Sequence, residues 1–198
     1  MLIVSVTDRK HCVRPLAEQI ELICRGGADA VVLRERDLGR AEYMELAHLI
    51  MDICKSFGTE FIAHGGADRA EELGADGAWM TFAELEEKGR PAHMKAVVSV
   101  HSLLEAADAC RLGADMLVFG NVCETSCKPG KPAAGFGALR EVCASSSVPV
   151  LAIGGMDAPA ARLAAEAGAA GVCLMSGLMS ADDPETIVAG IRASSGRR

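Results

Sequence analysis

The chain has 198 residues and a net charge of −7, and half of its residues are hydrophobic while only 4% are aromatic. The acidic balance argues against a general nucleic-acid-binding surface. No apolar run is long enough to cross a membrane, and the first residues read as a strand rather than as a signal peptide. We therefore expect a cytoplasmic protein with an aliphatic core and with neither nucleic acid nor membrane as a partner.

A repeated phrase of Gly, Ala and Asp followed by an apolar run organises the predicted secondary structure. It occurs at Gly27–Asp29, Gly74–Asp76 and Gly113–Asp115, and in weaker form at Gly168–Ala170. Each copy follows a stretch with helical periodicity, so the Gly is expected to end a helix and the apolar run to begin a buried strand.

Strands and helices are predicted to alternate along the whole chain. The predicted strands are Leu2–Thr7, Ala30–Arg34, Glu60–His64, Gly77–Met80, Ala96–Val100, Met116–Gly120, Val148–Ile153 and Gly171–Met175. The predicted helices lie near Pro15–Arg25, Ala41–Phe57, Asp68–Leu73, Leu103–Leu112, Phe136–Ala144, Ala158–Ala167 and Pro184–Ala193, with a short polar connection at Phe82–Lys88.

Eight strands that alternate with helices predict an α/β protein of the (β/α)8 TIM-barrel class, with a single domain over residues 1–198. The competing fold is an open doubly wound sheet. That fold would carry a Gly-x-Gly-x-x-Gly phosphate loop after the first strand, where this chain has Thr7-Asp8-Arg9-Lys10.

The cysteines predict neither disulfides nor a metal site. Most of the eight fall within helical or strand patterns, where Cys acts as a small apolar residue. Cys123 and Cys127 stand alone, without the second close pair that zinc sites show. We expect reduced thiols and no bound metal.

Two turns near the end of the chain predict a phosphate site. Gly154 and Gly155 follow the seventh predicted strand, and Ser176 and Gly177 follow the eighth. In barrels of this class the loops after these two strands form a recurrent phosphate site, with backbone amides as donors. The alternative is that the paired glycines only make a tight turn.

Two further segments predict contacts with an anionic substrate. Arg34 directly follows a buried strand, so its guanidinium should lie at the barrel mouth and grip an oxyanion. The long polar segment 121–135 is expected to cover the substrate, with Thr125 and Lys128 as its contacts. The alternative is a tolerated surface insertion.

Several motifs in this order resemble the thiamin phosphate synthase superfamily over nearly the whole chain. They are Leu33-Arg34-Glu35-Arg36-Asp37-Leu38, Ser99-Val100-His101-Ser102, the segment 119–128, Ile153-Gly154-Gly155 and Met175-Ser176-Gly177. The resemblance implies a small phosphorylated heterocyclic substrate and places Ser99 among the substrate-binding residues. One branch, the synthase, joins a pyrimidine pyrophosphate to a thiazole phosphate using magnesium. The other, thiazole tautomerase, aromatises a thiazole carboxylate phosphate by moving a proton.

Departures from the family pattern separate the two branches. The synthase carries Asn-Asp after the third strand, where this chain has His64-Gly65, and its second magnesium-binding Asp aligns near Glu84. Losing a carboxylate ligand disfavours a hard cation. The loop sequence Glu-Thr-x-Cys-Lys is also closer to the tautomerase. The resemblance therefore favours a tautomerase without a metal cofactor, and magnesium is expected only for the synthase.

The proton-transfer group is the weak point of the tautomerase interpretation. That branch is thought to use a His directly after the Gly of the sixth strand, and this catalytic position is Asn121 here. We expect His64 to act as the acid or base because its ordinary pKa suits the task, with Glu35 as the other candidate. His101 is expected to cap or orient the following helix.

The leading hypothesis from the sequence is a thiazole tautomerase-like enzyme of thiamin biosynthesis. The alternatives are thiamin phosphate synthase with a rebuilt pyrimidine site, and a non-catalytic binder of thiazole phosphate or thiamin phosphate. A homo-oligomer is compatible with the sequence.

Overall fold

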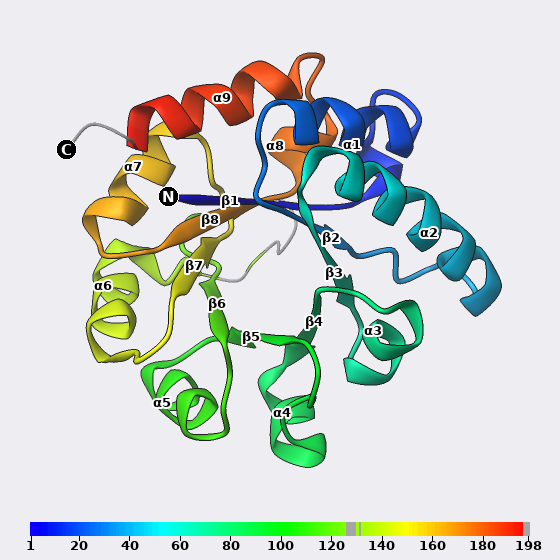
Figure 1. The fold of residues 1–198 in the computed structure, drawn as a ribbon. Coiled ribbons are helices and arrows are strands. Elements are labelled where there is room, and N and C mark those ends of the chain that lie inside the picture. Colours follow the sequence, from blue (N-terminus) through cyan, green and yellow to red (C-terminus); the bar gives the residue numbers. More distant parts are fainter. Residues whose placement is uncertain (126–129, 131, 196–198) are drawn as a thin grey trace.

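Eight parallel strands close into a barrel in the order of the chain (Figure 1). The structure is a computed structural model that describes residues 1–125, 130 and 132–195. The strands are β1 (Leu2–Val6), β2 (Ala30–Leu33), β3 (Glu60–His64), β4 (Gly77–Thr81), β5 (Lys95–Val100), β6 (Met116–Gly120), β7 (Val150–Ile153) and β8 (Gly171–Leu174). Strand β1 pairs with both β2 and β8, which closes the barrel and confirms the predicted (β/α)8 fold.

Helices surround the barrel and cover its outer face (Figure 1). The helices between strands are α1 (Leu16–Arg25), α2 (Arg40–Phe57), α3 (Ala67–Leu73), α4 (Phe82–Lys88), α5 (Leu103–Arg111), α6 (Gly135–Ser145) and α7 (Ala158–Glu166), with α9 (Pro184–Ser195) closing the ring. Two short elements were not predicted from the sequence: η1 (Arg9–His11), a 3-10 turn after β1, and α8 (Ser176–Met179), directly after β8. The segment that was expected only as a polar connection is the helix α4.

The apolar core has two layers because side chains alternate along each strand. One layer lies between the barrel and the helices. The other fills the barrel interior, and apart from Trp79 its members are small or aliphatic. The interior residues are Val4, Val6, Ala30, Val32, Ile62, Trp79, Val97, Val118, Leu151 and Cys173. Every second residue of a strand therefore points into the barrel, and we call this the inward parity of the strand. The same alternation extends to the residues that follow the strand at the barrel mouth.

Every cysteine that the structure describes is a free thiol, and Cys127 lies outside the described residues. None of the described helices is long and apolar enough to span a bilayer.

The glycines of the repeated phrase adopt the backbone conformation that the sequence predicts. Their φ angles are 91° at Gly27, 65° at Gly74, 87° at Gly113 and 99° at Gly168. Residues with a Cβ rarely adopt positive φ, so glycine allows the chain to leave the helix and turn directly into the next strand.

The aspartates of the repeated phrase bind the neighbouring strand. In each full copy the Asp carboxylate accepts a hydrogen bond from a backbone N–H at the start of that strand. The pairs are Asp29 with Ile3 (2.7 Å), Asp76 with Phe61 (2.8 Å) and Asp115 with Ala96 (2.8 Å). The weaker copy has Ala170, which lacks a carboxylate and keeps backbone hydrogen bonds alone, from its own N–H to the carbonyl of Val150 (2.8 Å) and from the N–H of Leu2 to its carbonyl (2.8 Å). The carboxylates thus satisfy donors at strand ends that the sheet ladder leaves unpaired.

We predict that Asp76→Ala lowers the free energy of unfolding by about 1–3 kcal/mol, because the N–H of Phe61 loses its charged acceptor. Urea denaturation measures this difference. The control is Asp52→Ala, which removes an exposed carboxylate from α2 and should cost less than about 0.5 kcal/mol. Equal losses in the two variants would contradict a structural role for the repeated aspartate.

Candidate active site

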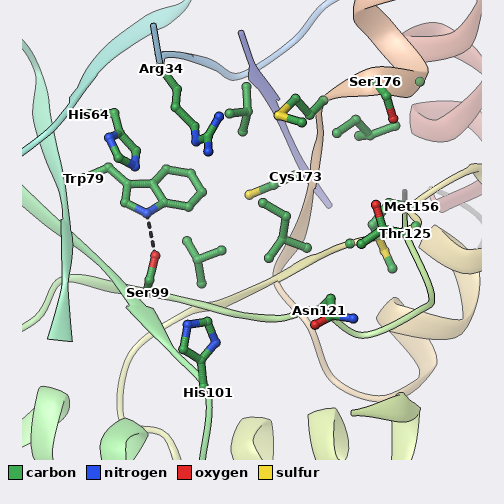
Figure 2. Close-up of a pocket in the computed structure, with 18 of the residues that line it drawn as sticks. Arg34, His64, Trp79, Ser99, His101, Asn121, Thr125, Met156, Cys173 and Ser176 are labelled. Atoms are coloured by element: carbon green, nitrogen blue, oxygen red, sulfur yellow. Dashed lines mark hydrogen bonds between the residues drawn. The ribbon is translucent and has the colours of Figure 1, made fainter. Parts of the chain in front are cut away.

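A pocket of about 290 Å³ lies at the carboxyl ends of the strands (Figure 2). Arginine and histidine side chains line one side, and the glycine turns after β7 and β8 line the other. Val6, Val118 and Cys173, which belong to the barrel interior, form its apolar floor. The pocket therefore stands directly on the uppermost layer of the core.

Two arginines reach the pocket from the segment that follows β2. Arg34 and Arg36 share the inward parity of Val32, and both line the cavity. The N–H of Arg34 donates to Thr7 Oγ1 at 2.9 Å, which ties this segment to the end of β1. The predicted location of Arg34 at the barrel mouth agrees with the structure. Arg36 was not among the residues predicted to line the site, although it lies two residues after Arg34 and therefore points to the same side of the chain.

His64 lies beside these arginines at the end of β3. Its Nε2 is 3.4 Å from Arg36 Nη2, and because a guanidinium only donates, Nε2 accepts and the neutral ring carries its proton on Nδ1. Burial, together with the positive charges of Arg36 and Arg34, lowers the pKa of His64 to about 4. His64 is therefore neutral at pH 7 and a weaker base than its ordinary pKa suggested.

An aromatic wall stands next to His64. The indole N–H of Trp79 donates to Ser99 Oγ at 2.7 Å, and its ring centroid lies 6.2 Å from that of His64 (Figure 2). Trp79 and Ser99 both line the pocket, so Ser99 lies where the resemblance placed it. A large aromatic ring fixed by a hydrogen bond offers an apolar face to a heterocycle.

His101 lies in the pocket rather than acting as a helix cap. The cap of α5 is Ser102, whose Oγ accepts the N–H of Glu105 at 3.1 Å. The ring Nδ1 of His101 lies 2.6 Å from the carbonyl oxygen of Gly120. Since that oxygen can only accept, Nδ1 carries a proton. The sequence contained the signal for this position, because His101 continues the inward parity of Val97 and Ser99.

The loop after β6 contributes two of the predicted residues. Asn121 and Thr125 both line the pocket. The side-chain amide of Asn121 lies within 3.4 Å of the carbonyl of Cys123, and an amide cannot exchange a proton near neutral pH. Lys128, the other predicted contact of this loop, lies outside the described residues.

The turns after β7 and β8 come together on the opposite side of the pocket. Gly154, Gly155, Ser176 and Gly177 all line the cavity, as the phosphate prediction requires. The φ angles of Gly154 and Gly155 are 99° and 64°. A Cβ on Gly154 would lie 2.6 Å from the Cβ of Asn121, and one on Gly155 would lie 2.5 Å from a backbone oxygen of the same loop. The glycines thus make a tight turn and also border the pocket, so the two interpretations are compatible.

Glu35 does not face the pocket. It follows Arg34 directly, so its side chain points the opposite way, and the residue as a whole is 4% exposed. The carboxylate accepts the backbone N–H of Arg9 at 3.0 Å and Arg9 Nη1 at 2.9 Å. This position differs from the expectation of an acid or base at the barrel mouth, because alternation sends the residue after Arg34 to the outside.

The described side chains do not fit the magnesium ion that the synthase branch uses. Glu84 does not line the pocket, and its Oε2 accepts both the N–H of Thr81 at 2.7 Å and the Thr81 hydroxyl at 2.9 Å. His64, Arg34 and Arg36 face the cavity instead. Magnesium prefers oxygen ligands, and carboxylates above all. Within the described ranges no group of three or more His, Cys, Asp or Glu side chains could hold a metal ion.

Comparison with known proteins identifies the relatives of this chain. A family model described as thiamine monophosphate synthase matches residues 3–178. A thiamine-phosphate synthase from Coprothermobacter proteolyticus is 32% identical over 85% of this chain and 82% of its own length. One from Geobacillus kaustophilus is 32% identical over 90% of this chain and 84% of its own length.

The solved structures agree with the sequence relatives. A thiamine phosphate pyrophosphorylase from Pyrococcus furiosus superposes with a TM-score of 0.86 at 26% identity, covering 98% of this chain and 95% of that one. A 3-hexulose-6-phosphate synthase, at a TM-score of 0.74 and 18% identity, shares the fold. The names of these sequence relatives favour the synthase over the tautomerase that the motifs had favoured.

We predict that stability falls more steeply with acid in the parent protein than in a His64→Gln variant. The folded-state pKa of about 4 lies below the ordinary value near 6.5, so protons bind preferentially to the unfolded chain. Stability is therefore lost progressively as the pH falls from about 6.5 to 4, by an amount on the order of 2 kcal/mol. Urea denaturation at several pH values measures this loss. Parallel pH dependences in the parent and the variant would contradict the perturbed imidazole.

Proposed function

Because the chain belongs to the thiamine monophosphate synthase family, we propose that it is an enzyme of thiamin biosynthesis that couples a pyrimidine pyrophosphate to a thiazole phosphate. The observation that carries this proposal is the layout of the pocket. Groups that can bind anions, the arginines and the glycine turns, lie on two opposite sides of the pocket, and an apolar and aromatic surface lies between them. A site of this kind suits two anionic groups joined through heterocyclic rings.

The glycine side of the pocket takes the phosphate of the thiazole. Gly154, Gly155 and Gly177 bring backbone close to the cavity, and Ser176 adds a hydroxyl. A hydroxyl and backbone amides bind phosphate oxygens without a net charge, which suits a group that is retained in the product.

The arginine side takes the pyrophosphate. Arg34 and Arg36 are permanently charged and present forked donors that match phosphate oxygens. Coupling expels pyrophosphate, so negative charge develops on the leaving group. Two guanidinium groups stabilise that charge where the described residues offer no pair of carboxylates for a metal ion.

The aromatic wall holds the rings between these two sides. Trp79 is the only tryptophan of the chain, and its hydrogen bond to Ser99 fixes the plane of the indole. A fixed aromatic face reduces the entropic cost of holding a flat heterocycle in one orientation.

The thiazole tautomerase remains a second candidate, on the strength of one observation. Two imidazoles, His64 and His101, line the pocket. The Nε2 of His64 accepts from Arg36, whereas His101 uses Nδ1 for the carbonyl of Gly120 and keeps Nε2 as its other ring nitrogen. Aromatising a thiazole carboxylate phosphate needs such a proton acceptor and no leaving group. In that reaction the arginines would hold the carboxylate, and Asn121 would take no part in proton transfer.

Incubation of the purified protein with each substrate set distinguishes the candidates. We expect thiamin phosphate to form from the pyrimidine pyrophosphate and the thiazole phosphate, both with magnesium and in the presence of a chelator. Isomerisation of the thiazole carboxylate phosphate without coupling would establish the tautomerase instead. Binding without either reaction would leave the non-catalytic binder, and coupling that stops with chelator would contradict the role given to the arginines.

We predict that Ser176→Ala raises the dissociation constant for inorganic phosphate about fivefold, the loss of one neutral hydrogen bond worth about 1 kcal/mol. Isothermal titration calorimetry measures the change. Ser56→Ala, which removes an exposed hydroxyl from α2, serves as the control and should bind phosphate as the parent does. Unchanged affinity in Ser176→Ala would remove this serine from the phosphate site.

A further inference from the structure

The segment after β2 carries charges of alternating sign, and the structure sorts them onto opposite sides. Arg34 and Arg36 both line the pocket, Arg34 half-buried and Arg36 exposed at its rim. Glu35 and Asp37 point away from it, and both carboxylates contact Arg9 of η1. The acidic residues therefore take no part in lining the cavity, although they stand directly between and beside the residues that do.

Glu35 is the most buried member of this cluster. Its side chain is 2% exposed, and each carboxylate oxygen accepts one hydrogen bond from Arg9, from the backbone at 3.0 Å and from Nη1 at 2.9 Å. A buried carboxylate is costly unless charged donors satisfy it. The pairing with Arg9 meets that cost and leaves Glu35 a single orientation.

Arg9 extends the same contact to Asp37. Its two terminal nitrogens donate to the two carboxylate oxygens at 2.6 and 2.8 Å, a forked pair. Hydrogen bonds from Arg9 and then Lys10 hold the pKa of Asp37 well below its ordinary value. Arg9 thus binds the residues directly before and after Arg36, which are Glu35 and Asp37.

Thr7, the residue after β1, also binds the segment that follows β2. The N–H of Thr7 donates to the carbonyl of Val32 at 2.9 Å, and Thr7 Oγ1 accepts the N–H of Arg34 at 2.9 Å. Thr7 and Arg9 therefore fasten the segment after β2 at successive points, from the end of the strand to Asp37.

We infer that Glu35 is a positioning residue, which through Arg9 holds the backbone from which Arg34 and Arg36 project side by side into the pocket. Two guanidinium groups of like charge repel each other, so an unrestrained segment would turn one of them towards solvent. Because the carboxylates of Glu35 and Asp37 are bound to Arg9, the backbone between them is fixed. Arg34 and Arg36 then stay directed at the same anion. The inference rests on the proposed function only in taking a pyrophosphate group as that anion.

Inorganic pyrophosphate is the probe that tests this role, with affinity measured by isothermal titration calorimetry in the presence of a chelator. We expect Glu35→Gln to raise its dissociation constant at least tenfold, because the neutral amide no longer holds Arg9. The matched control is Glu72→Gln, which removes the carboxylate of another arginine pair, with Arg40, on the protein surface. It should leave the affinity unchanged.

A double-mutant cycle separates positioning from general damage to the fold. If Glu35 acts through the arginines, Glu35→Gln has no further effect on pyrophosphate affinity in an Arg34→Gln/Arg36→Gln background. A purely structural role would weaken that background as much as it weakens the parent. Arg9→Lys provides a second variant should Glu35→Gln fail to fold: it keeps a positive charge beside Glu35 but loses the fork to Asp37, and we expect it to weaken binding several-fold.

Three results would overturn the inference. They are parent-like pyrophosphate affinity in folded Glu35→Gln, or in Arg9→Lys if only that variant folds; full additivity in the cycle; and no pyrophosphate binding by the parent protein. Failure of the coupling assay with normal pyrophosphate binding would reject the proposed function and leave the role of Glu35 intact.

Discussion

The alternation of side chains along closed parallel strands is the constraint on which the rest of this structure depends. Every second residue must enter the barrel interior, which small aliphatic side chains fill. Past the last ladder hydrogen bond, the same alternation decides which side chains reach the pocket. Arg34, Ser99 and His101 enter it for this reason, and Glu35 is sent outside for the same reason. Packing of the core and composition of the site therefore have one origin.

Much of the fold was accessible from the sequence because its signals are local. Each Gly-Ala-Asp phrase combines a helix end, a turn and a strand start within a few residues. The glycines were correctly interpreted as positive-φ residues, whereas the carboxylates of Asp29, Asp76 and Asp115 were not assigned a partner. The backbone N–H groups that donate to them belong to neighbouring strands, and the register that brings donor and carboxylate together is a property of the closed sheet.

The site was predictable where parity or turn chemistry is explicit, as for Arg34 and the glycines after β7. Applying the same alternation to Glu35 and His101 would have placed Glu35 outside the pocket and His101 in it. Other features depend on groups far apart in the chain. The contact between Arg9 and Glu35 joins residues 26 positions apart, and the lowered pKa of His64 arises from burial and from the arginines that follow β2. The partners in these contacts are too far apart in the chain for a local sequence pattern to reveal them.

We propose that one pocket binds two anions, one on the glycine turns and one between the two arginines. A crystal of the protein soaked with inorganic phosphate and pyrophosphate would show where each anion binds. We expect phosphate on the turns of Gly154–Gly155 and Ser176–Gly177, pyrophosphate between Arg34 and Arg36, and Glu35 still bound to Arg9. Anions bound away from these groups, or Glu35 turned into the pocket, would contradict it.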